Sequence, residues 1–567
     1  MKCLTTGAIV RQVRSGRESW DPTIPELALR GRKTEAMSEN SVPRNDGLDR
    51  RTFLRATVLG VAGVTAPALL GLGDVASAAR RRRATTTTTP PGPAGPRLRV
   101  GAPGFSALEA HSVGFDSDTM MSLSGLVTEH LVGLDSSFRL LPQLATDWRS
   151  NDVGTIWSFT VRSGVVFHNG APVTAEAIAA SLRTTLAAGQ GGQLTGIVAP
   201  DAVRALRPNI VRFTLAVPFG LFPYLVSSDN PASAIVNKRA GSKAGEWLGG
   251  TGPFVALKPE AGTGTANALP LRRNAKYWRT LRTPLPYQSA QLVGYANDDD
   301  AAGLFAAKTV DLVTKVNNRA LAKYGDPNLL AINMAKSTAH YQVHMRTDGG
   351  VFADRRVRQA LQLAVDRVEL AKVLYGGRSD VANDTAFASF LPFVGQVAAR
   401  PQNISAAKQL MRDARQRSGF TTKIALGNSP DALALAGSLA SFAAKIGIVL
   451  EPAPSDTYFA DSWLNSDVGI TEFSHRATPG ALVAATLGSD GQWNAPHYRD
   501  PKLDALIRTL SVSRDTRVIQ STTQAVAEQL RSSVPILVPF FMRRTWLARK
   551  QGFTPLQVSP HGQMTFV

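Results

Sequence analysis

The chain has 567 residues, of which 44% are hydrophobic, and a formal net charge of +20 at pH 7. That length is sufficient for several domains with large cores. The charge alone is compatible with nucleic-acid binding. However, the only dense basic run is Arg80–Arg83, and no nucleic-acid motif accompanies it. We therefore interpret the excess charge as a solvated surface and exclude nucleic acid as a partner.

The stretch DRRTFLRATVLGVAGVTAPALLGLGDVASAA, residues 49–79, has the pattern of an export signal. Arg50 and Arg51 precede a weakly apolar segment, and the triplet ASA at 76–78 is a small-residue cleavage site. The pattern predicts a twin-arginine signal peptide, with the twin-arginine export machinery as a partner. The alternative is a membrane anchor, which the short, Gly- and Ala-rich apolar run disfavours.

The segments around this signal show no domain pattern. Residues 1–48 read as a non-structural extension, and Met37 offers an alternative start. Cys3 is the only cysteine and precedes the cleavage site, so the exported chain would have no disulfide, no thiol nucleophile and no lipid-anchoring cysteine. The Arg/Thr/Pro-rich run 80–96 predicts a disordered linker. We expect the folded part to begin near Arg97, where RLRVGAP reads as a strand.

The segment VRSGVVFHNGAPVTAEAIAASLR, residues 161–183, predicts a strand end, a turn and a capped helix. Alternating apolar residues lead into it, and Asn169 and Gly170 favour a turn because both tolerate positive φ. Thr174 can cap the helix that follows. His168 has no second metal ligand or base nearby in the sequence, so we interpret it as part of the scaffold.

Two later stretches have equally readable patterns. In DRRVRQALQLAVDR, Asp354 can cap a helix that Gly376 and Gly377 would end. The stretch HYQVHM suits a strand, on which His340 and His344 would lie too far apart to chelate one metal ion. The predicted helix has one apolar face, made of Val357, Ala360, Leu361, Ala364, Val365 and Val368.

Several segments resemble, in the same order, those of the family 5 solute-binding proteins of ABC importers, the dipeptide, oligopeptide and nickel-chelate binders. The resemblance extends over about residues 97–540. It is carried by LLPQLATDW, SFTVRSGVVFHNGAPVTAEAI, GGTGPFVALK, LRRNAKYW, DRRVRQALQLAVDR, LASFAAKIGIVLE and DPKLDALI. Strands alternate with helices along this part of the chain, which independently argues for α/β layers.

The resemblance implies an α/β, two-lobe periplasmic-binding-protein fold of the class II type, with an extra subdomain in lobe one. The hinge would consist of two crossing segments, near Asp311–Asn318 and Val534–Phe541. Lobe one would comprise 97–316 and 534–567, and lobe two 317–533. A peptide or peptide-sized solute would bind in the interlobe cleft, and a membrane ABC permease would receive it from the closed form.

The family's peptide binders carry two aspartates in a lobe-two segment, and the first neutralises the peptide's α-ammonium. The corresponding stretch here is GITEFSHRATPGAL, which places His475 at the first position and Thr478 at the second. One interpretation is that His475 and Arg476 select an anionic or neutral ligand, with Arg476 holding a carboxylate. The other is a displaced alignment, in which Glu472 or another acid pairs with the amine.

Two further residues are candidate ligand contacts, because His111 and Met120 fall where the family has its first cleft loop. We expect no metal and no cofactor, and a monomeric protein. The sequence lacks HExxH, GxSxG, Walker and GxGxxG motifs, so we expect a binding protein and not an enzyme. The alternative function is a ligand sensor that signals through a partner. Peptide, sugar, acid and metal chelate all remain open as the cargo.

Overall fold

The part of the chain that the structure describes combines strands and helices, some alternating and some in consecutive runs of one kind. The computed structural model describes residues 96–103, 118–237, 249–257, 268–281, 285–325, 330–382, 384–397, 400–550 and 556–566. All of them belong to one of the chain's two units, Arg51–Val567. Some predicted features lie outside the described residues: the extension 1–48, the signal 49–79 with Arg50 and Arg51, the linker up to residue 95, His111 and the side chain of Met120.

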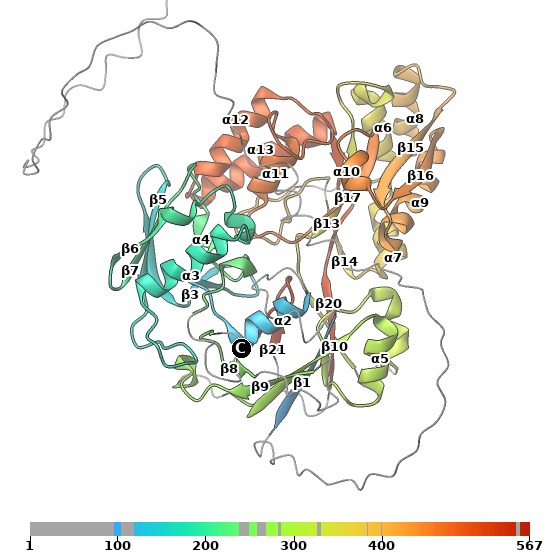
Figure 1. The fold of residues 1–567 in the computed structure, drawn as a ribbon. Helices are drawn as coiled ribbons and strands as arrows, with labels where there is room; N and C mark the ends of the chain where they lie inside the picture. Colours follow the sequence, from blue (N-terminus) through green and yellow to red (C-terminus); the bar gives the residue numbers. More distant parts are fainter. Residues whose placement is uncertain are drawn as a thin grey trace, which may run out of the picture. The chain divides into compact units, whose positions relative to one another are not determined.

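The first lobe is organised around a mixed seven-stranded sheet in the order β12-β20-β11-β1-β10-β9-β8. Figure 1 labels five of its strands, β1, β8, β9, β10 and β20. Its first strand is β1 (Arg97–Pro103), as the sequence predicts, and it runs parallel to both β10 and β11. The other strands are β8 (Phe254–Ala256), β9 (Ala268–Arg273), β10 (Ser289–Tyr295), β11 (Leu312–Val313), β12 (Leu330–Ala335) and β20 (Arg544–Arg549). Helix α2 (Asp118–Val127) packs on one face and α5 (Asp298–Ala306) on the other.

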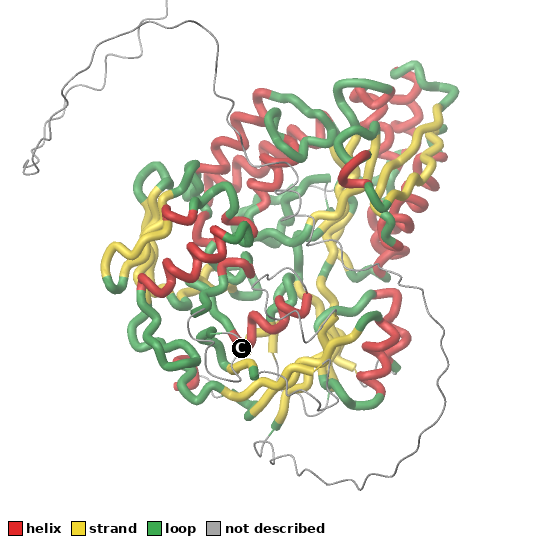
Figure 2. The backbone as a smooth tube through the Cα atoms, viewed as in Figure 1, coloured by secondary structure: helices red, strands yellow, loops and turns green. Residues whose placement is uncertain are grey.

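The second lobe contains the other large sheet, ordered β14-β19-β13-β17-β15-β16, with β18 pairing to β13. The strands are β13 (His340–Met345), β14 (Ser379–Val381), β15 (Phe420–Gly427), β16 (Ile448–Ser455), β17 (Val468–Phe473), β18 (Ile536–Leu537) and β19 (Phe540–Met542). Figure 2 shows helices beside these strands. The helices are α6 (Arg355–Ala364), α7 (Arg367–Tyr375), α8 (Ile404–Asp413), α9 (Pro430–Ala444), α10 (Tyr458–Asp461), α11 (Pro479–Leu487), α12 (Pro501–Val512) and α13 (Thr516–Ser533).

The crossing segments differ from those expected. Strand β12 pairs with β20 along its whole length, and β11 pairs with β1 and β20, so both belong to the first sheet. Strands β18 and β19 pair with β13, so they belong to the second sheet. The chain therefore changes sheet at residues 336–339 and returns at Arg543. Both points lie after the predicted segments Asp311–Asn318 and Val534–Phe541, because strand pairing continues past them.

The extra subdomain contains an antiparallel sheet ordered β4-β5-β7-β6. Its principal elements are β4 (Ala145–Ser150), β5 (Ile156–Val161), α3 (Ala175–Ala187), β6 (Val203–Arg207) and β7 (Ile210–Thr214). The shorter elements outside the large sheets are β2 (Val132–Leu134), β3 (Leu140–Pro142), α4 (Phe222–Leu225), β21 (Leu556–Val558) and β22 (Met564–Phe566).

The predicted strand, turn and capped helix of residues 161–183 are confirmed. Gly170 has a φ of 87°, and the Thr174 side chain accepts a hydrogen bond from the Ala177 N–H at the start of α3. The His168 ring Nε2 lies 3.0 Å from the Gly252 carbonyl oxygen. The backbone N–H of His168 donates to the Gly250 carbonyl oxygen at 2.9 Å. His168 therefore joins the subdomain to the glycine-rich segment and has a scaffold role.

The prediction of a single helix after Asp354 is wrong, because the structure has two helices there. Asp354 caps α6 as expected, but α6 ends at Ala364, and α7 begins at Arg367. The Asp366 carboxylate accepts hydrogen bonds from the N–H groups of Val368 and Glu369, which starts the second helix. The break turns Val368 away from the predicted apolar face, and it is 67% exposed.

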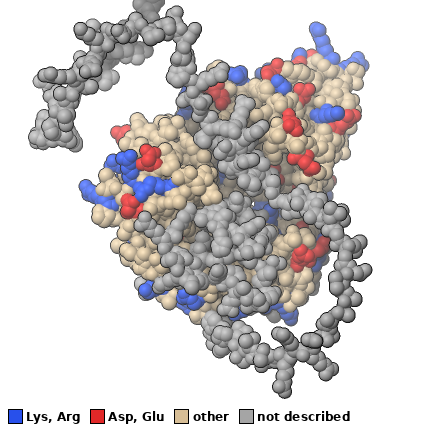
Figure 3. All heavy atoms as spheres, in the orientation of Figure 1, with Lys and Arg blue, Asp and Glu red and all other residues tan. Residues whose placement is uncertain are grey.

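Charge on the surface is mixed. Figure 3 shows Lys and Arg groups interspersed with Asp and Glu groups over the described part of one face. This distribution agrees with our interpretation of the net charge as a solvated surface. Among the described helices, none is long and apolar enough to cross a membrane.

The glycine-rich segment allows a prediction about packing. An added Cβ at Gly250 would lie 1.9 Å from the Val127 carbonyl oxygen, a backbone atom that cannot give way easily. We expect Gly250→Ala to lower the unfolding free energy by about 1–3 kcal/mol, measured by urea denaturation. Gly303→Ala is the control, because a Cβ there meets nothing within 4 Å in helix α5. Equal stability of the two variants would contradict the packing argument.

Candidate ligand-binding site

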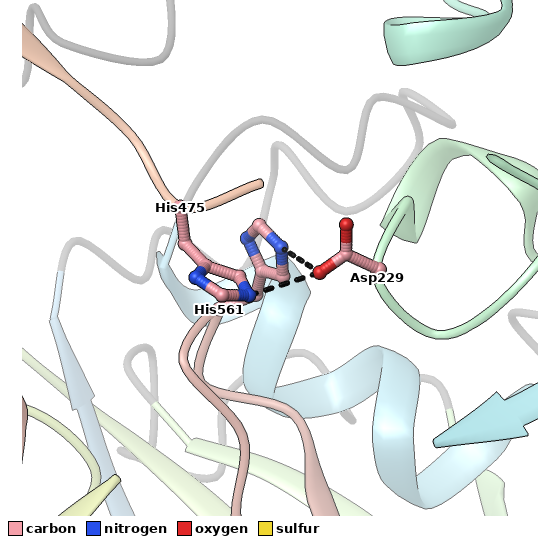
Figure 4. A group of neighbouring side chains, drawn as sticks. All are labelled: Asp229, His475 and His561. Atoms are coloured by element: carbon pink, nitrogen blue, oxygen red, sulfur yellow. Dashed lines mark ion pairs between the residues drawn. The ribbon is translucent and has the colours of Figure 1, made fainter. Parts of the chain in front are cut away.

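Three polar side chains from distant parts of the chain meet at one point (Figure 4). Asp229 lies in the turn after α4, His475 follows β17, and His561 lies between β21 and β22. The Asp229 Oδ1 atom is 3.0 Å from His475 Nε2 and 3.5 Å from His561 Nε2. Lobe one thus contributes the carboxylate and one imidazole, and lobe two contributes the other imidazole.

The turn that carries Asp229 is fixed by its own polar residues. The Asp229 N–H donates to the Ser227 hydroxyl oxygen at 3.1 Å, and the Asn230 amide donates to Leu225 O at 2.9 Å. Such side-chain to backbone bonds are typical of Ser- and Asn-rich turns. The carboxylate therefore has a defined direction, and its Oδ2 accepts the Ala477 N–H at 2.7 Å.

The Asp229 carboxylate is buried. Burial raises its pKa, and the contacts with His475 and His561 lower it below its usual range. Among the described residues only these two histidines form ion pairs with it. Arg476 is close enough for Asp229 to oppose the lowering of the Arg476 pKa by burial, yet the two form no ion pair.

A backbone bond fixes the protonation state of His475. The Thr338 N–H donates to His475 Nδ1 at 2.8 Å, so Nδ1 must carry a lone pair and no proton. The ring is then neutral, with its proton on Nε2, the atom that faces Asp229. Burial lowers the pKa of His475 against the opposing effect of Asp229, which agrees with a neutral ring.

Thr338 also binds the residue next to His475. Its hydroxyl donates to the Arg476 carbonyl oxygen and accepts the Arg476 N–H, both at 2.8 Å. Since Thr338 lies in the crossing segment 336–339, the hinge and the candidate site share these hydrogen bonds. His475 is thereby held at the point where lobe two meets the crossing segment.

A third histidine, His130, lies near His561. It is buried, with its Nδ1 3.0 Å from the Ser233 hydroxyl and its Nε2 3.2 Å from the Gln563 amide nitrogen. Burial, assisted by repulsion from His561, lowers the pKa of His130 to about 3. His130 is therefore neutral in the folded protein at ordinary pH.

Several buried polar atoms where Asp229, His475 and His561 meet have no well-aligned hydrogen bond. Asp229 Oδ1, His475 Nε2 and His561 Nε2 are buried, and the ion-pair contacts between them are too poorly aligned to be hydrogen bonds. The hydroxyl oxygen of Thr478 is buried and unpaired as well. Buried polar atoms of this kind are uncommon and usually face a polar partner.

A metal ion does not fit this group directly. A metal would need the lone pair of His475 Nε2, whereas the Thr338 N–H keeps the proton on that atom. Only Asp229 and His561 would remain as ligands, fewer than metal sites ordinarily use.

The predicted ligand residues occupy different environments. His475 is buried, and Arg476 is half-buried, with its guanidinium 5.9 Å from the centre of the Trp493 ring. Glu472 lies on β17 and accepts a hydrogen bond from the Tyr341 hydroxyl at 3.2 Å. Thr478 precedes α11. The structure does not place His111 or the Met120 side chain.

Sequence reasoning missed Asp229, His561 and His130. Asp229 stands in the polar string SSDN, which reads as a surface turn, and its bond to Ala477 spans 248 residues. His561 stands alone near the carboxyl terminus. No local pattern connects these residues, because only the tertiary fold brings them together.

Comparison with known proteins identifies the fold. The profile of bacterial extracellular solute-binding proteins, family 5 middle region, matches residues 139–493. Protein XP55 of Streptomyces lividans is 25% identical over 465 residues, covering 75% of this chain and 82% of that protein. The glutathione-binding protein GsiB of Escherichia coli is 23% identical over 300 residues, covering 52% of this chain but only 57% of GsiB.

Solved structures show the same architecture. The unliganded open form of the periplasmic murein tripeptide binding protein MppA superposes with a TM-score of 0.70 at 20% identity. The match covers 83% of this chain and 95% of MppA. The predicted α/β, two-lobe periplasmic-binding-protein fold is confirmed.

The buried neutral His130 makes stability depend on pH. In the unfolded chain His130 is protonated below its ordinary pKa of 6.5, whereas in the folded chain it is protonated only below about pH 3. Unfolding free energy therefore falls as pH drops through this window, by about 1.4 kcal/mol per pH unit for this residue. His130→Gln is expected to reduce the slope between pH 6 and 4 by about that amount, measured by urea denaturation. An unchanged slope would show that His130 is protonated in the folded protein.

Proposed function

Since the chain belongs to the family 5 bacterial extracellular solute-binding proteins, and is thus the solute-binding component of an ABC transporter, we propose that its cargo is a peptide-sized solute held at the Asp229–His475–His561 site. The observation that carries this proposal is the group of buried, poorly bonded polar atoms to which both lobes contribute. Such a group suits a ligand whose own polar atoms complete the hydrogen bonds.

The names of similar proteins support this size class. GsiB is described as glutathione-binding and MppA as a murein tripeptide binding protein. The periplasmic binding protein DppA from Helicobacter pylori was solved with the peptide STSA and superposes with a TM-score of 0.60 at 18% identity. These cargoes share a polar backbone of a few residues.

The proposed mechanism is hinge closure. Cargo bound to one lobe gains contacts with the other lobe only when the lobes close, so binding shifts the population toward the closed form. The membrane permease then recognises the closed form and receives the cargo. We propose that the protein acts as a monomer and that it binds its cargo without transforming it.

The other predicted ligand residues keep proposed roles. Arg476, half-buried beside Trp493, would bind a carboxylate of the cargo. The unpaired Thr478 hydroxyl and Glu472 would offer polar contacts in lobe two. His111 and Met120 would belong to the first cleft loop.

The protein acts outside the cytoplasm, as its family does. We propose that it reaches this compartment by the twin-arginine route, without a lipid anchor. This proposal rests on the arginine pair at 50–51, the weakly apolar segment after it and the absence of a cysteine beyond Cys3.

Loss of the Arg476 guanidinium provides a test of the cargo site. The exported protein should release a peptide-sized solute on denaturation, detected by comparing native and denaturing mass spectra. Arg476→Ala is expected to weaken binding of that solute by roughly 10- to 100-fold, measured by titration calorimetry. Arg508→Ala, which removes an exposed arginine on α12, is the matched control. Equal affinity of the two variants would remove Arg476 from the site.

Export provides a separate test. Replacement of the pair by lysine, Arg50→Lys with Arg51→Lys, is expected to retain the protein in the cytoplasm, because the twin-arginine machinery requires the pair. Immunoblots of cytoplasmic and extracytoplasmic fractions measure the distribution. Normal export of the double variant would point to another route.

A further inference from the structure

We propose that the first lobe carries a second binding site, a basic groove for a linear phosphate-linked polymer of the cell envelope. The groove consists of two adjoining hollows with volumes of about 670 and 950 Å³, and Ala275 lines both. The described residues of its walls all precede the crossing segment 336–339, so the groove lies outside the candidate cargo site. A polymer bound there leaves the cargo site open.

The walls of the groove carry one sign of charge. Among the described residues they contain no Asp or Glu, and the sequence has none between Glu260 and Asp298. A groove of one sign raises the local concentration of ligands of the opposite sign. The basic residues of the walls are Arg97, Arg162, Arg272, Arg273 and Lys276.

The basic residues are spread along the groove. Arg97 on β1, Ser289 on β10 and Arg272 on β9 are paired across three neighbouring strands, so their side chains lie on one face of the sheet. With about 4.8 Å between strands, the Cα atoms of the two arginines are roughly 10 Å apart. Lys276 is exposed in the adjoining hollow. Charges spaced in this way suit an extended chain with repeated negative charges better than one small anion.

The polar residues of the walls are of the kinds that bind phosphate. Phosphate oxygens accept hydrogen bonds from Arg and Lys and from Ser, Thr, Asn and Gln side chains. Besides the basic residues, the walls include Ser289, Gln291, Thr160 and Asn209. An arginine can also donate two parallel hydrogen bonds to one phosphate. The groove therefore offers both charge and hydrogen-bond donors along its length.

One arginine of the groove is held in place by its neighbours. The Arg162 guanidinium lies 4.4 Å from the centre of the Trp278 ring, and its Nε donates to the Gln143 carbonyl oxygen at 2.8 Å. A side chain that is already ordered loses less entropy when a ligand binds. Arg162 is thus prepared to contact a phosphate.

The aromatic residues of the walls disfavour nucleic acid as the polymer. Single-stranded nucleic acids bind proteins by stacking their bases on open aromatic rings. Tyr277 and Trp278 instead pack edge to face on one another, and the guanidiniums of Arg162 and Arg279 lie over the Trp278 ring. The groove is therefore built for the backbone of a polymer and not for bases.

Such a groove would keep the exported protein at the cell envelope. Since we propose export without a lipid anchor, another contact must hold the protein near its permease. A polymer bound to the first lobe supplies this contact, and the second lobe remains able to close on the cargo.

The experiment titrates the full exported protein with inorganic polyphosphate, a linear chain of phosphates. We expect binding that weakens as the salt concentration rises, because each neutralised phosphate releases a counterion. Arg97→Gln with Lys276→Gln, one residue from each hollow, is expected to weaken binding roughly 10-fold and to reduce the slope of log affinity against log salt by about 1–2. Calorimetry at several salt concentrations measures both. Absence of polyphosphate binding by the wild-type protein would overturn the proposal.

The matched control is Lys502→Gln with Arg508→Gln, which removes the same charge from exposed positions on α12. It should retain the wild-type affinity. Equal weakening of the two double variants would show that only the net charge matters, and would overturn the groove. Replacement of Arg80–Arg83 by glutamine tests the basic run of the predicted linker. A loss of binding confined to that variant would also overturn the groove.

Two further probes test the class of ligand. Single-stranded DNA with the same number of phosphates is expected to bind no more tightly than polyphosphate, and much tighter binding would identify nucleic acid as the ligand. Vesicles of phosphatidylglycerol present phosphates on a flat surface that cannot enter a groove. Binding to the vesicles without binding to polyphosphate would assign the basic residues to a membrane instead. Either result would overturn the envelope polymer, and neither affects the proposed cargo site.

Discussion

The hydrogen bond from the Thr338 N–H to His475 Nδ1 determines the chemistry of the whole site. It fixes the imidazole tautomer, places a proton opposite Asp229 and removes His475 from the possible metal ligands. Because a backbone amide cannot change its role from donor to acceptor, the ring is a neutral donor as long as the loop after β17 keeps its place. His475 therefore contributes no net charge to the site, which contains the Asp229 carboxyl group.

The two lobes around this bond hold different residues of the candidate site. Lobe one holds Asp229 in the turn after α4, while the loop after β17 holds His475 and Arg476. Gly250 and Gly252 let the glycine-rich segment approach the backbone at the end of α2, and His168 joins the subdomain to this segment. Residues that look chemical in the sequence, such as His168, turn out to be structural, and residues that look structural, such as Asp229, face the site.

Local patterns in the sequence predicted individual helices and strands, the family resemblance predicted the two-lobe fold, and neither predicted Asp229 or His561 at the candidate site. The strand at Arg97–Pro103, the capped helix after Thr174 and the start of α6 at Asp354 each depend on neighbours within a few residues, so composition and spacing predict them. The break before Arg367 was missed, because the apolar residues continue at helical spacing past it. The Asp366 side chain nevertheless caps a second helix there.

The site depends on contacts of another kind. Asp229, His475 and His561 each follow a different element, and neither their spacing nor their flanking residues connect them. Family resemblance directed attention to residues 469–482, which contain His475 and Arg476 of the candidate site. It did not point to Asp229, which lies far from that segment in the sequence.

The crossing segment that contains Thr338 has a geometric consequence. A rigid lobe that rotates about short crossings carries each atom through an arc proportional to its distance from the axis. In the hinge closure proposed above, atoms at the rim of the lobe would therefore travel far, whereas His475, bonded to the crossing segment, would shift little. In the proposed closure, new contacts with the cargo would thus come mainly from the rim of lobe two, while His475 keeps its place beside Asp229.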